Sequence, residues 1–169
     1  MLNFDYSIGT KIFFGKDKID VLASNIKKYG SNVLLVYGGG SIKRSGLYDK
    51  IVTIFNKNDI EFCELSGVEP NPRITSVRKG IELCRENKVD IILAVGGGSV
   101  IDCSKVIGAG YYYNGDAWDI VLDSRKITKV LPIATILTLA ATGSEMDAGA
   151  VISNLDTNEK LPADRKSVV

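Results

Sequence analysis

Three glycines, Gly96–Gly98, directly follow the apolar run Ile91–Val95 and precede a segment with helical spacing that opens at Ser99. This order predicts a buried strand that turns tightly into a helix and leaves bare backbone at the turn. Glycines let an extended anionic ligand approach the main chain, and the free N–H groups at a helix start favour a phosphate. A valine at Gly97 would fill that space, and we expect it to resist a left-handed backbone there. The alternative is an ordinary turn, with Ser99 capping the helix and Asp102 completing a capping box.

A second glycine run, Gly38–Gly40, follows the apolar residues Val33–Tyr37, which suggests two contact points for one long nucleotide. Many dinucleotide folds carry a carboxylate after such a strand to bind the adenosine ribose. Here Ser41, Lys43 and Arg44 follow instead. A hydroxyl and nearby cations tolerate a 2′-phosphate better than a carboxylate does, so we expect at most a modest preference for NADP(H). Alternatively, the two cations belong to a solvated first turn of a helix.

A third segment, Thr138–Glu145, is rich in hydroxyl and glycine residues and follows another apolar run. Its threonine and serine hydroxyls could bind a phosphate or a cofactor amide. A plain loop in which Ser144 caps the next helix is equally consistent with this composition.

The histidine, carboxylate and cysteine content of the chain argues against a catalytic triad or a metal site. The chain has no histidine, which excludes a histidine-based triad or a histidine-ligated metal within these residues. Three carboxylates surround Trp118 in the sequence: Asp116, Asp119 and Asp123. We expect them to lie in a solvated loop and short helix rather than at a metal. Three cysteines form no CxxC pair and are expected to be buried, reduced thiols of a cytoplasmic protein: Cys63, Cys84 and Cys103.

Apolar runs alternate along the chain with segments whose apolar residues fall on one helical face. The predicted strands are Lys11–Phe14, Asn32–Tyr37, Ile60–Leu65, Ile91–Val95 and Val130–Ala134. The predicted helices carry the apolar sets Ile19/Leu22/Ile26/Tyr29, Leu47/Ile51/Ile54/Phe55 and Ile74/Val77/Ile81/Cys84, with a fourth over Ser99–Tyr112. Asn71 and Pro72 suit the cap and first turn of the third helix. The pattern predicts an α/β fold: a Rossmann-like parallel sheet with helices on both faces. Both glycine turns should then lie at the carboxyl edge of the sheet.

Composition fits one globular domain of 169 residues, 45% of them hydrophobic. Lys and Arg number 21 against 20 Asp and Glu, so no basic footprint predicts a nucleic-acid partner. The longest apolar-leaning stretch, Val130–Ala141, is too short to span a membrane, and Met1–Thr10 shows no signal peptide.

Five strings in order along the chain resemble the iron-containing (group III metal-dependent) alcohol dehydrogenases, and the butanol dehydrogenase branch most. The strings are Lys11–Lys16 (KIFFGK), Tyr37–Ser41 (YGGGS), Val68–Pro72 (VEPNP), Ala94–Lys105 (AVGGGSVIDCSK) and Thr138–Ser153 (TLAATGSEMDAGAVIS). The resemblance covers the N-terminal, dehydroquinate synthase-like domain of that family. It implies that residues 1–160 form a dinucleotide-binding domain for NADP(H) or NAD(H).

The resemblance also implies roles for individual residues. It assigns Gly39 and Ser41 to the adenosine ribose; Gly97, Gly98 and Ser99 to the pyrophosphate; Asp102 to the nicotinamide end; Thr138 and Thr142 to hydroxyl contacts; and Lys160 to the nicotinamide ribose.

Family members continue into a helical domain, whose one Asp and three His ligands hold Fe²⁺ or Zn²⁺. Residues 161–169 depart from the family's continuation, so we expect a divergent tail there and a truncation before that domain. The resemblance implies hydride transfer between NAD(P)H and a small aldehyde or primary alcohol, by a full-length homodimer. This chain alone is expected to hold no catalytic or metal-ligating residue and to show no metal-dependent aldehyde reduction. A non-catalytic dinucleotide-binding fragment and a glycerol dehydrogenase-like protein remain alternatives, although Thr138–Ser153 favours the alcohol dehydrogenases.

Overall fold

The computed structural model describes residues 9–163 and contains one parallel sheet of four strands in the order β2-β1-β3-β4. The strands are β1 (Asn32–Tyr37), β2 (Glu61–Leu65), β3 (Ile91–Gly96) and β4 (Ile133–Leu137). The continuously apolar strands β1 and β3 occupy the centre of the sheet, as expected for strands buried on both faces. The predicted α/β fold is therefore confirmed.

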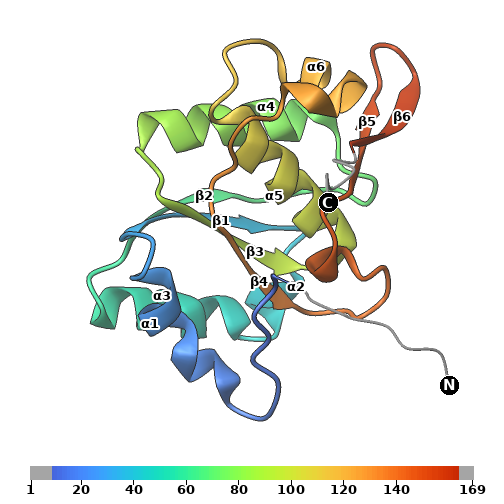
Figure 1. Cartoon of the computed structure of the whole chain (residues 1–169). Helices are drawn as coiled ribbons and strands as arrows, with labels where there is room; N and C mark the ends of the chain where they lie inside the picture. Colours follow the sequence, from blue (N-terminus) through green and yellow to red (C-terminus); the bar gives the residue numbers. More distant parts are fainter. Residues whose placement is uncertain (1–8, 164–169) are drawn as a thin grey trace, which may run out of the picture.

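Helices cover both faces of this sheet (Figure 1). One face carries α1 (Leu22–Ile26) and α3 (Leu47–Lys57), and the other carries α4 (Ile74–Glu86), α5 (Gly98–Gly110) and α6 (Ala117–Leu122). Successive strand residues point to opposite faces. Val33 and Leu35 accordingly belong to the core under α1 and α3, whereas Leu34 and Val36 belong to the core under α4 and α5. The short helices are η1 (Lys18–Val21), α2 (Ser41–Arg44), η2 (Ser124–Lys126) and η3 (Ser144–Met146).

Helices α4 and α5 pack closely because each contributes a glycine at their contact. A Cβ atom on Gly80 would lie 2.4 Å from Ile107 Cδ1, and one on Gly110 would lie 2.3 Å from Ile81 Cδ1. Both distances are far below van der Waals contact. This packing fixes α5, which starts at the second glycine turn, against the rest of the domain.

A separate antiparallel hairpin, β5 (Ala150–Asn154) and β6 (Glu159–Ala163), lies beside α5. The Ser153 backbone N–H donates to the Pro72 carbonyl at 2.9 Å, which ties the hairpin to the loop before α4. The boundary expected between residues 160 and 161 falls within β6. Residues 1–8, where we expect no signal peptide, and residues 164–169 of the expected tail lie outside the described residues.

Two predictions near the N-terminus are wrong. Lys11–Phe14 forms no strand; its apolar side chains have no sheet to cover, and Phe14 is 93% exposed. The first helical segment ends at Ile26, so Tyr29 lies in a turn and is 59% exposed instead of joining the buried face.

Two predicted elements begin later than expected. β4 begins at Ile133 rather than Val130, because Pro132 has no N–H to donate and the Leu131 N–H donates to the Gly108 carbonyl instead. Helix α4 begins at Ile74 with Arg73 as its N-cap, so Asn71 and Pro72 lie in the preceding loop.

The three cysteines are free thiols, with Cys84 and Cys103 buried and Cys63 partly exposed. Within residues 9–163, none of the helices has the length and apolar character needed to cross a membrane.

Candidate functional site

The carboxyl ends of three neighbouring strands meet at one edge of the sheet. Tyr37 of β1 pairs with Val95 of β3, and Gly96 of β3 pairs with Leu137 of β4. The two glycine turns and the hydroxyl-rich segment each start immediately after these positions. The expectation that both glycine turns share one edge is therefore confirmed.

The second glycine turn leads into the 13-residue helix α5 without a side-chain cap. Gly97 is the N-cap, with φ −96° and ψ −167°, and α5 begins at Gly98. The predictions of a Ser99 cap and of a left-handed Gly97 are therefore wrong: Ser99 lies in the first turn of the helix. The first N–H groups of an α-helix have no partner within it, so Gly98 and Ser99 present free donors at this turn.

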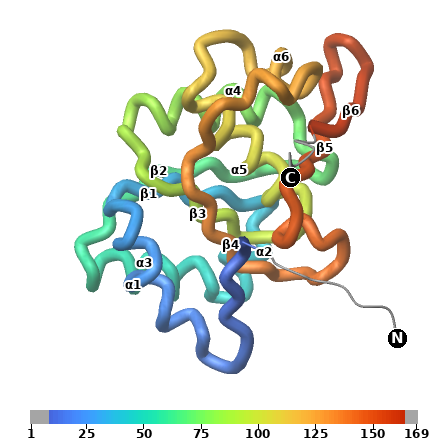
Figure 2. Tube along the Cα trace, viewed as in Figure 1, coloured from blue at the N-terminus to red at the C-terminus, as the bar shows by residue number. Residues whose placement is uncertain are grey.

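The segment after β4 packs directly on this turn. In Figure 2 it loops out and returns toward α5 before it enters β5. A Cβ atom on Gly98 would lie 2.4 Å from Thr142 Oγ1 and 3.2 Å from Ser144 Oγ. These two hydroxyls are hydrogen-bonded to each other at 2.8 Å. Glycine at position 98 is therefore what allows the hydroxyl-rich loop to reach the start of α5.

Other residues of this loop leave room at the turn. A Cβ atom on Gly97 would meet only Leu139 Cβ, at 3.8 Å, so the space beyond it is open. Thr138 is exposed, and its N–H continues the strand ladder to the Gly96 carbonyl. Ser144 is buried and forms the first residue of η3, whose N-cap is Gly143, so the alternative of a Ser144 cap is wrong.

The first glycine turn is more open and has a different geometry. Gly40 takes the left-handed conformation with φ 95°, which glycine adopts without strain. Gly39 is exposed, with no atom within 4 Å of a Cβ position, and Ser41 starts the four-residue helix α2. The N–H groups of Gly67 and Val68 donate to the Gly38 and Tyr37 carbonyls at 3.3 and 3.2 Å. The segment after β2 therefore lies along the same edge.

Asp102 on α5 contains an unpaired buried acceptor. Its Oδ2 atom accepts a hydrogen bond from the Val151 N–H at 3.0 Å, which links α5 to the hairpin. Its Oδ1 atom is buried and has no partner within the described part of the chain. An unsatisfied buried polar atom costs about 1–3 kcal/mol, and such atoms are rare enough in native proteins that each calls for an explanation. One helical turn further, the Lys105 ammonium contacts Asp147 Oδ1 and the Gly149 carbonyl at 2.7 and 2.6 Å.

Lys160, on β6, makes its side-chain contact away from both glycine turns. Its ammonium donates to Asn71 Oδ1 at 2.6 Å, in the loop before α4. None of the hydrogen bonds or ion pairs between residues 9 and 163 joins it to Gly97 or Gly39.

The sequence analysis missed a cluster beside the first turn, made by side chains from four elements: Tyr37, Lys43, Tyr48 and Glu64. The Glu64 carboxylate accepts hydrogen bonds from both tyrosine hydroxyls. Its hydrogen bond raises the pKa of Tyr48 to about 12, with burial as the second cause. Only the register that pairs Glu64 with Leu35 brings these groups together, and the sequence alone does not specify that register.

The carboxylates around Trp118 serve the local structure. Asp116 caps α6 by accepting from the Trp118 N–H, and it forms two hydrogen bonds with Arg78 at 2.8 and 3.0 Å. The Arg78 guanidinium lowers the pKa of Asp116. Asp123 accepts from Arg125 in the same way. Across residues 9–163, no three histidine, cysteine or carboxylate side chains are grouped to hold a metal ion, so the described residues do not fit a catalytic metal.

Comparison with known proteins shows the family to which this chain belongs. A family model described as "Iron-containing alcohol dehydrogenase" matches residues 9–169. The chain belongs to the iron-containing alcohol dehydrogenase family. The match runs through residues 161–169, which we expected to diverge.

Relatives in this family match nearly the whole chain. NADH-dependent butanol dehydrogenase A of Clostridium acetobutylicum is 73% identical over 161 residues, which are 95% of this chain and 41% of that protein. The NADPH-dependent aldehyde reductase YqhD of Escherichia coli is 42% identical, with 95% of this chain and 41% of that protein covered. The crystal structure of NADH-dependent butanol dehydrogenase A from Thermotoga maritima superposes with a TM-score of 0.91 at 45% identity. It covers 97% of this chain and 42% of the other. The chain thus spans about two-fifths of its relatives' length.

Proposed function

We propose that this chain is the NAD(P)H-binding part of a dehydrogenase that interconverts aldehydes and primary alcohols by hydride transfer. The observation that carries the proposal is the turn at Gly97 and Gly98. There an uncapped helix start, an open space and an unpaired buried oxygen of Asp102 lie at one edge of the sheet. These features fit a long, anionic ligand that also has a hydrogen-bond donor at one end.

The ligand is proposed to lie along the carboxyl edge of the sheet. Its pyrophosphate would accept hydrogen bonds from the free backbone donors at Gly98 and Ser99, over the space left open by Gly97. Its adenosine ribose would lie at the exposed Gly39 and at Ser41. The order of the strands supports this direction, because β1 and β3 are neighbours and their turns are adjacent.

The other assigned residues would act at the opposite end. Asp102 Oδ1 would accept a hydrogen bond from the nicotinamide end of the cofactor. Thr138 and Thr142 would offer hydroxyls from the loop over the turn, and Thr142 already lies against Gly98. Lys160 would need to leave Asn71 or act through it to reach the nicotinamide ribose.

When bound, the nicotinamide supplies the hydride for aldehyde reduction. The role of this chain would be to bind the cofactor, to orient it and to exclude water from one side of it. An Fe²⁺ or Zn²⁺ ion of the kind expected for this family would need ligands from outside the described residues. We therefore assign no step of the reaction to a metal held here.

Further properties belong to the same proposal. Residues 1–160 would form the dinucleotide-binding domain, and the full enzyme would act as a homodimer on small alcohols or aldehydes. A cytoplasmic location is supported by the three free thiols. A nucleic-acid partner is disfavoured by the net charge of +1.

Calorimetric titration of the chain with NADH and with NADPH tests the binding proposal directly. We expect saturable binding of at least one of them, and no binding of either by the folded chain would overturn it. The catalytic part needs a chimera in which residues 9–154 replace the corresponding segment of the Clostridium acetobutylicum NADH-dependent butanol dehydrogenase A. This chimera should reduce butanal with NAD(P)H, whereas the chain alone, with added Fe²⁺ or Zn²⁺, should not. A folded but inactive chimera would favour a non-catalytic binding segment.

A further inference from the structure

Two neighbouring cations follow the first glycine turn, and the structure holds them in different surroundings. The Lys43 ammonium lies over two aromatic rings, 4.5 Å from the ring centroid of Tyr48 and 5.3 Å from that of Tyr37. Both distances are within the range of a cation–π interaction. Lys43 therefore points toward α3 and the sheet.

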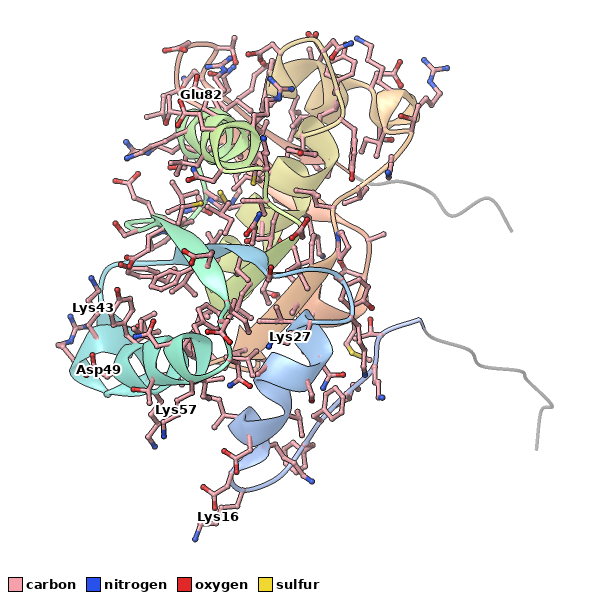
Figure 3. All side chains as sticks on the ribbon, turned by 90° about the vertical axis from the view of Figure 1, so that its left-hand side faces the viewer. Lys16, Lys27, Lys43, Asp49, Lys57 and Glu82 are labelled. Atoms are coloured by element: carbon pink, nitrogen blue, oxygen red, sulfur yellow. The ribbon has the colours of Figure 1, made fainter. Side chains whose placement is uncertain are left out.

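The charge of Lys43 is already compensated in this position. Both tyrosine hydroxyls also donate to the Glu64 carboxylate, so a negative charge lies next to the rings that Lys43 contacts. The pKa of Lys43 is raised, first by the Tyr37 side chain and also by the charges of Glu64 and Asp49. Figure 3 shows Lys43 beside the start of α3, close to Asp49.

The neighbouring Arg44 has no such partners. Among the described residues, its guanidinium makes no hydrogen bond, ion pair or ring contact. Instead its Nη1 atom lies 3.7 Å from the position that a Cβ atom on Gly40 would take, and no other atom comes within 4 Å of that position. The Arg44 guanidinium therefore has no partner among the described residues and lies next to the glycine turn.

We infer that Arg44, and not Lys43, is the side chain that recognises the 2′ position of the adenosine ribose and binds a 2′-phosphate there. The inference rests on the proposed function, because that proposal places the ribose at Gly39 and Ser41. A guanidinium presents paired N–H donors that match the oxygens of a phosphate. The ammonium of Lys43 would have to give up its contacts with Tyr37 and Tyr48 before it could do the same.

The test compares Arg44→Gln with Lys43→Gln, which remove adjacent positive charges by the same substitution. Calorimetric titration of each variant with NADPH and NADH measures the ratio of the two affinities. Loss of a charge-assisted contact should weaken NADPH binding by Arg44→Gln roughly 10- to 100-fold. NADH binding by Arg44→Gln, and binding of both cofactors by Lys43→Gln, should stay within about threefold of the original chain. Arg44→Lys should recover part of the lost NADPH affinity, because a lysine restores the charge without the paired donors.

A second probe lacks the nicotinamide end and reports on the ribose alone. The competitor 2′,5′-ADP should bind more weakly to Arg44→Gln than to the original chain, while 5′-AMP should not distinguish them. Equal losses for Lys43→Gln and Arg44→Gln would overturn the inference, and so would equal losses of NADH and NADPH affinity. Failure of the original chain to bind any dinucleotide would instead contradict the proposed function. If Arg44→Gln does not fold by circular dichroism, the Arg44→Lys variant with 2′,5′-ADP decides the question.

Discussion

The two glycine turns have the same three-residue composition but different structures. At Gly38–Gly40 a left-handed Gly40 leads into the four-residue helix α2, and Gly39 is exposed. At Gly96–Gly98 the backbone stays extended at Gly97 and leads into the 13-residue helix α5, most of which is buried. The second turn is covered by the hydroxyl-rich loop, through Thr142 and Ser144, whereas the first is contacted by the backbone of the segment after β2, at Gly67 and Val68.

This difference assigns different tasks to the turns. A long helix with free N–H groups can stabilise a phosphate, so the second turn is suited to the charged centre of a dinucleotide. The first turn has only a short helix but is surrounded by side chains that could distinguish one ribose from another, Arg44 among them. Binding strength is therefore expected to depend on the second turn, and cofactor preference on the first.

The largest expected effect comes from Gly97→Val at the second turn. The backbone at position 97 has φ −96°, which valine tolerates, and the nearest side-chain atom to its Cβ would be 3.8 Å away. The variant should therefore fold with a nearly unchanged melting temperature. Its side chain would occupy the proposed pyrophosphate space and remove several charge-assisted hydrogen bonds. We expect a loss of NADH affinity of about 100-fold or more by calorimetry.

Gly39→Val is the matched variant at the first turn. A Cβ atom there also meets open space, but the ribose contact is a smaller part of the binding free energy. We expect about a tenfold loss, equivalent to one polar contact. If the two valine variants lose equal affinity, the division of tasks between the turns is wrong.

Asp102→Asn should have a smaller effect on binding: it should weaken NADH binding without lowering the stability of the chain. The substitution keeps an oxygen to accept from the Val151 N–H and replaces a charged, unpaired buried acceptor with a neutral amide group, which costs less to bury. Urea unfolding should show a free energy of unfolding that is not lowered. NADH affinity should fall by roughly tenfold, because a donor group of the ligand would lose a charged acceptor.

Asp102→Ala provides the control, because it leaves the Val151 N–H without its acceptor. Its unfolding free energy should fall by about 1–3 kcal/mol. A variant Asp102→Asn that is less stable but binds NADH normally would show that Asp102 has only a structural role.

The central sheet could be predicted from the sequence, because β1 and β3 are continuous apolar runs that end at glycine. The alternation of strands and helices also predicted that both glycine turns lie at the carboxyl edge of the sheet. Strand boundaries depended on single backbone donors, as at Pro132, and Lys11–Phe14 shows that an apolar run forms a strand only where a neighbour can pair with it.

Those parts of the candidate site that are formed by backbone turns could be predicted from the sequence. The glycine turns and the hydroxyl-rich loop were found from composition, but the contact of Thr142 with Gly98 and the open acceptor on Asp102 depend on tertiary packing. The separation of Lys43 from Arg44 depends on side chains that come from β1, α3 and β2. No local pattern in the sequence links those three elements.

The smallest expected effect concerns this side-chain cluster at the first turn and appears only at high pH. The hydrogen bond to Glu64 raises the pKa of Tyr48 from an ordinary value of 10.0 to about 12. Between these values the folded chain holds a proton that the unfolded chain has lost, so this contribution to stability is complete below about pH 10 and is lost as the pH rises to about 12. Burial also raises the pKa values of Cys84 and Cys103 to about 12, so the original chain loses stability from several groups in this range.

Tyr48→Phe isolates the contribution of the tyrosine, because it removes one titrating proton and leaves the cysteines in place. The variant should be less stable than the original chain by about 1 kcal/mol near neutral pH, where it lacks the hydrogen bond to Glu64. The difference in unfolding free energy between the two chains should shrink as the pH rises from 10 to 12, measured by urea unfolding. Tyr29→Phe is the matched control, because it removes the hydroxyl of a tyrosine that is 59% exposed. A difference for Tyr48→Phe that stays constant across this range would mean that Glu64 does not hold the Tyr48 proton, and the first turn would then lack the rigid cluster that keeps Lys43 away from the ribose.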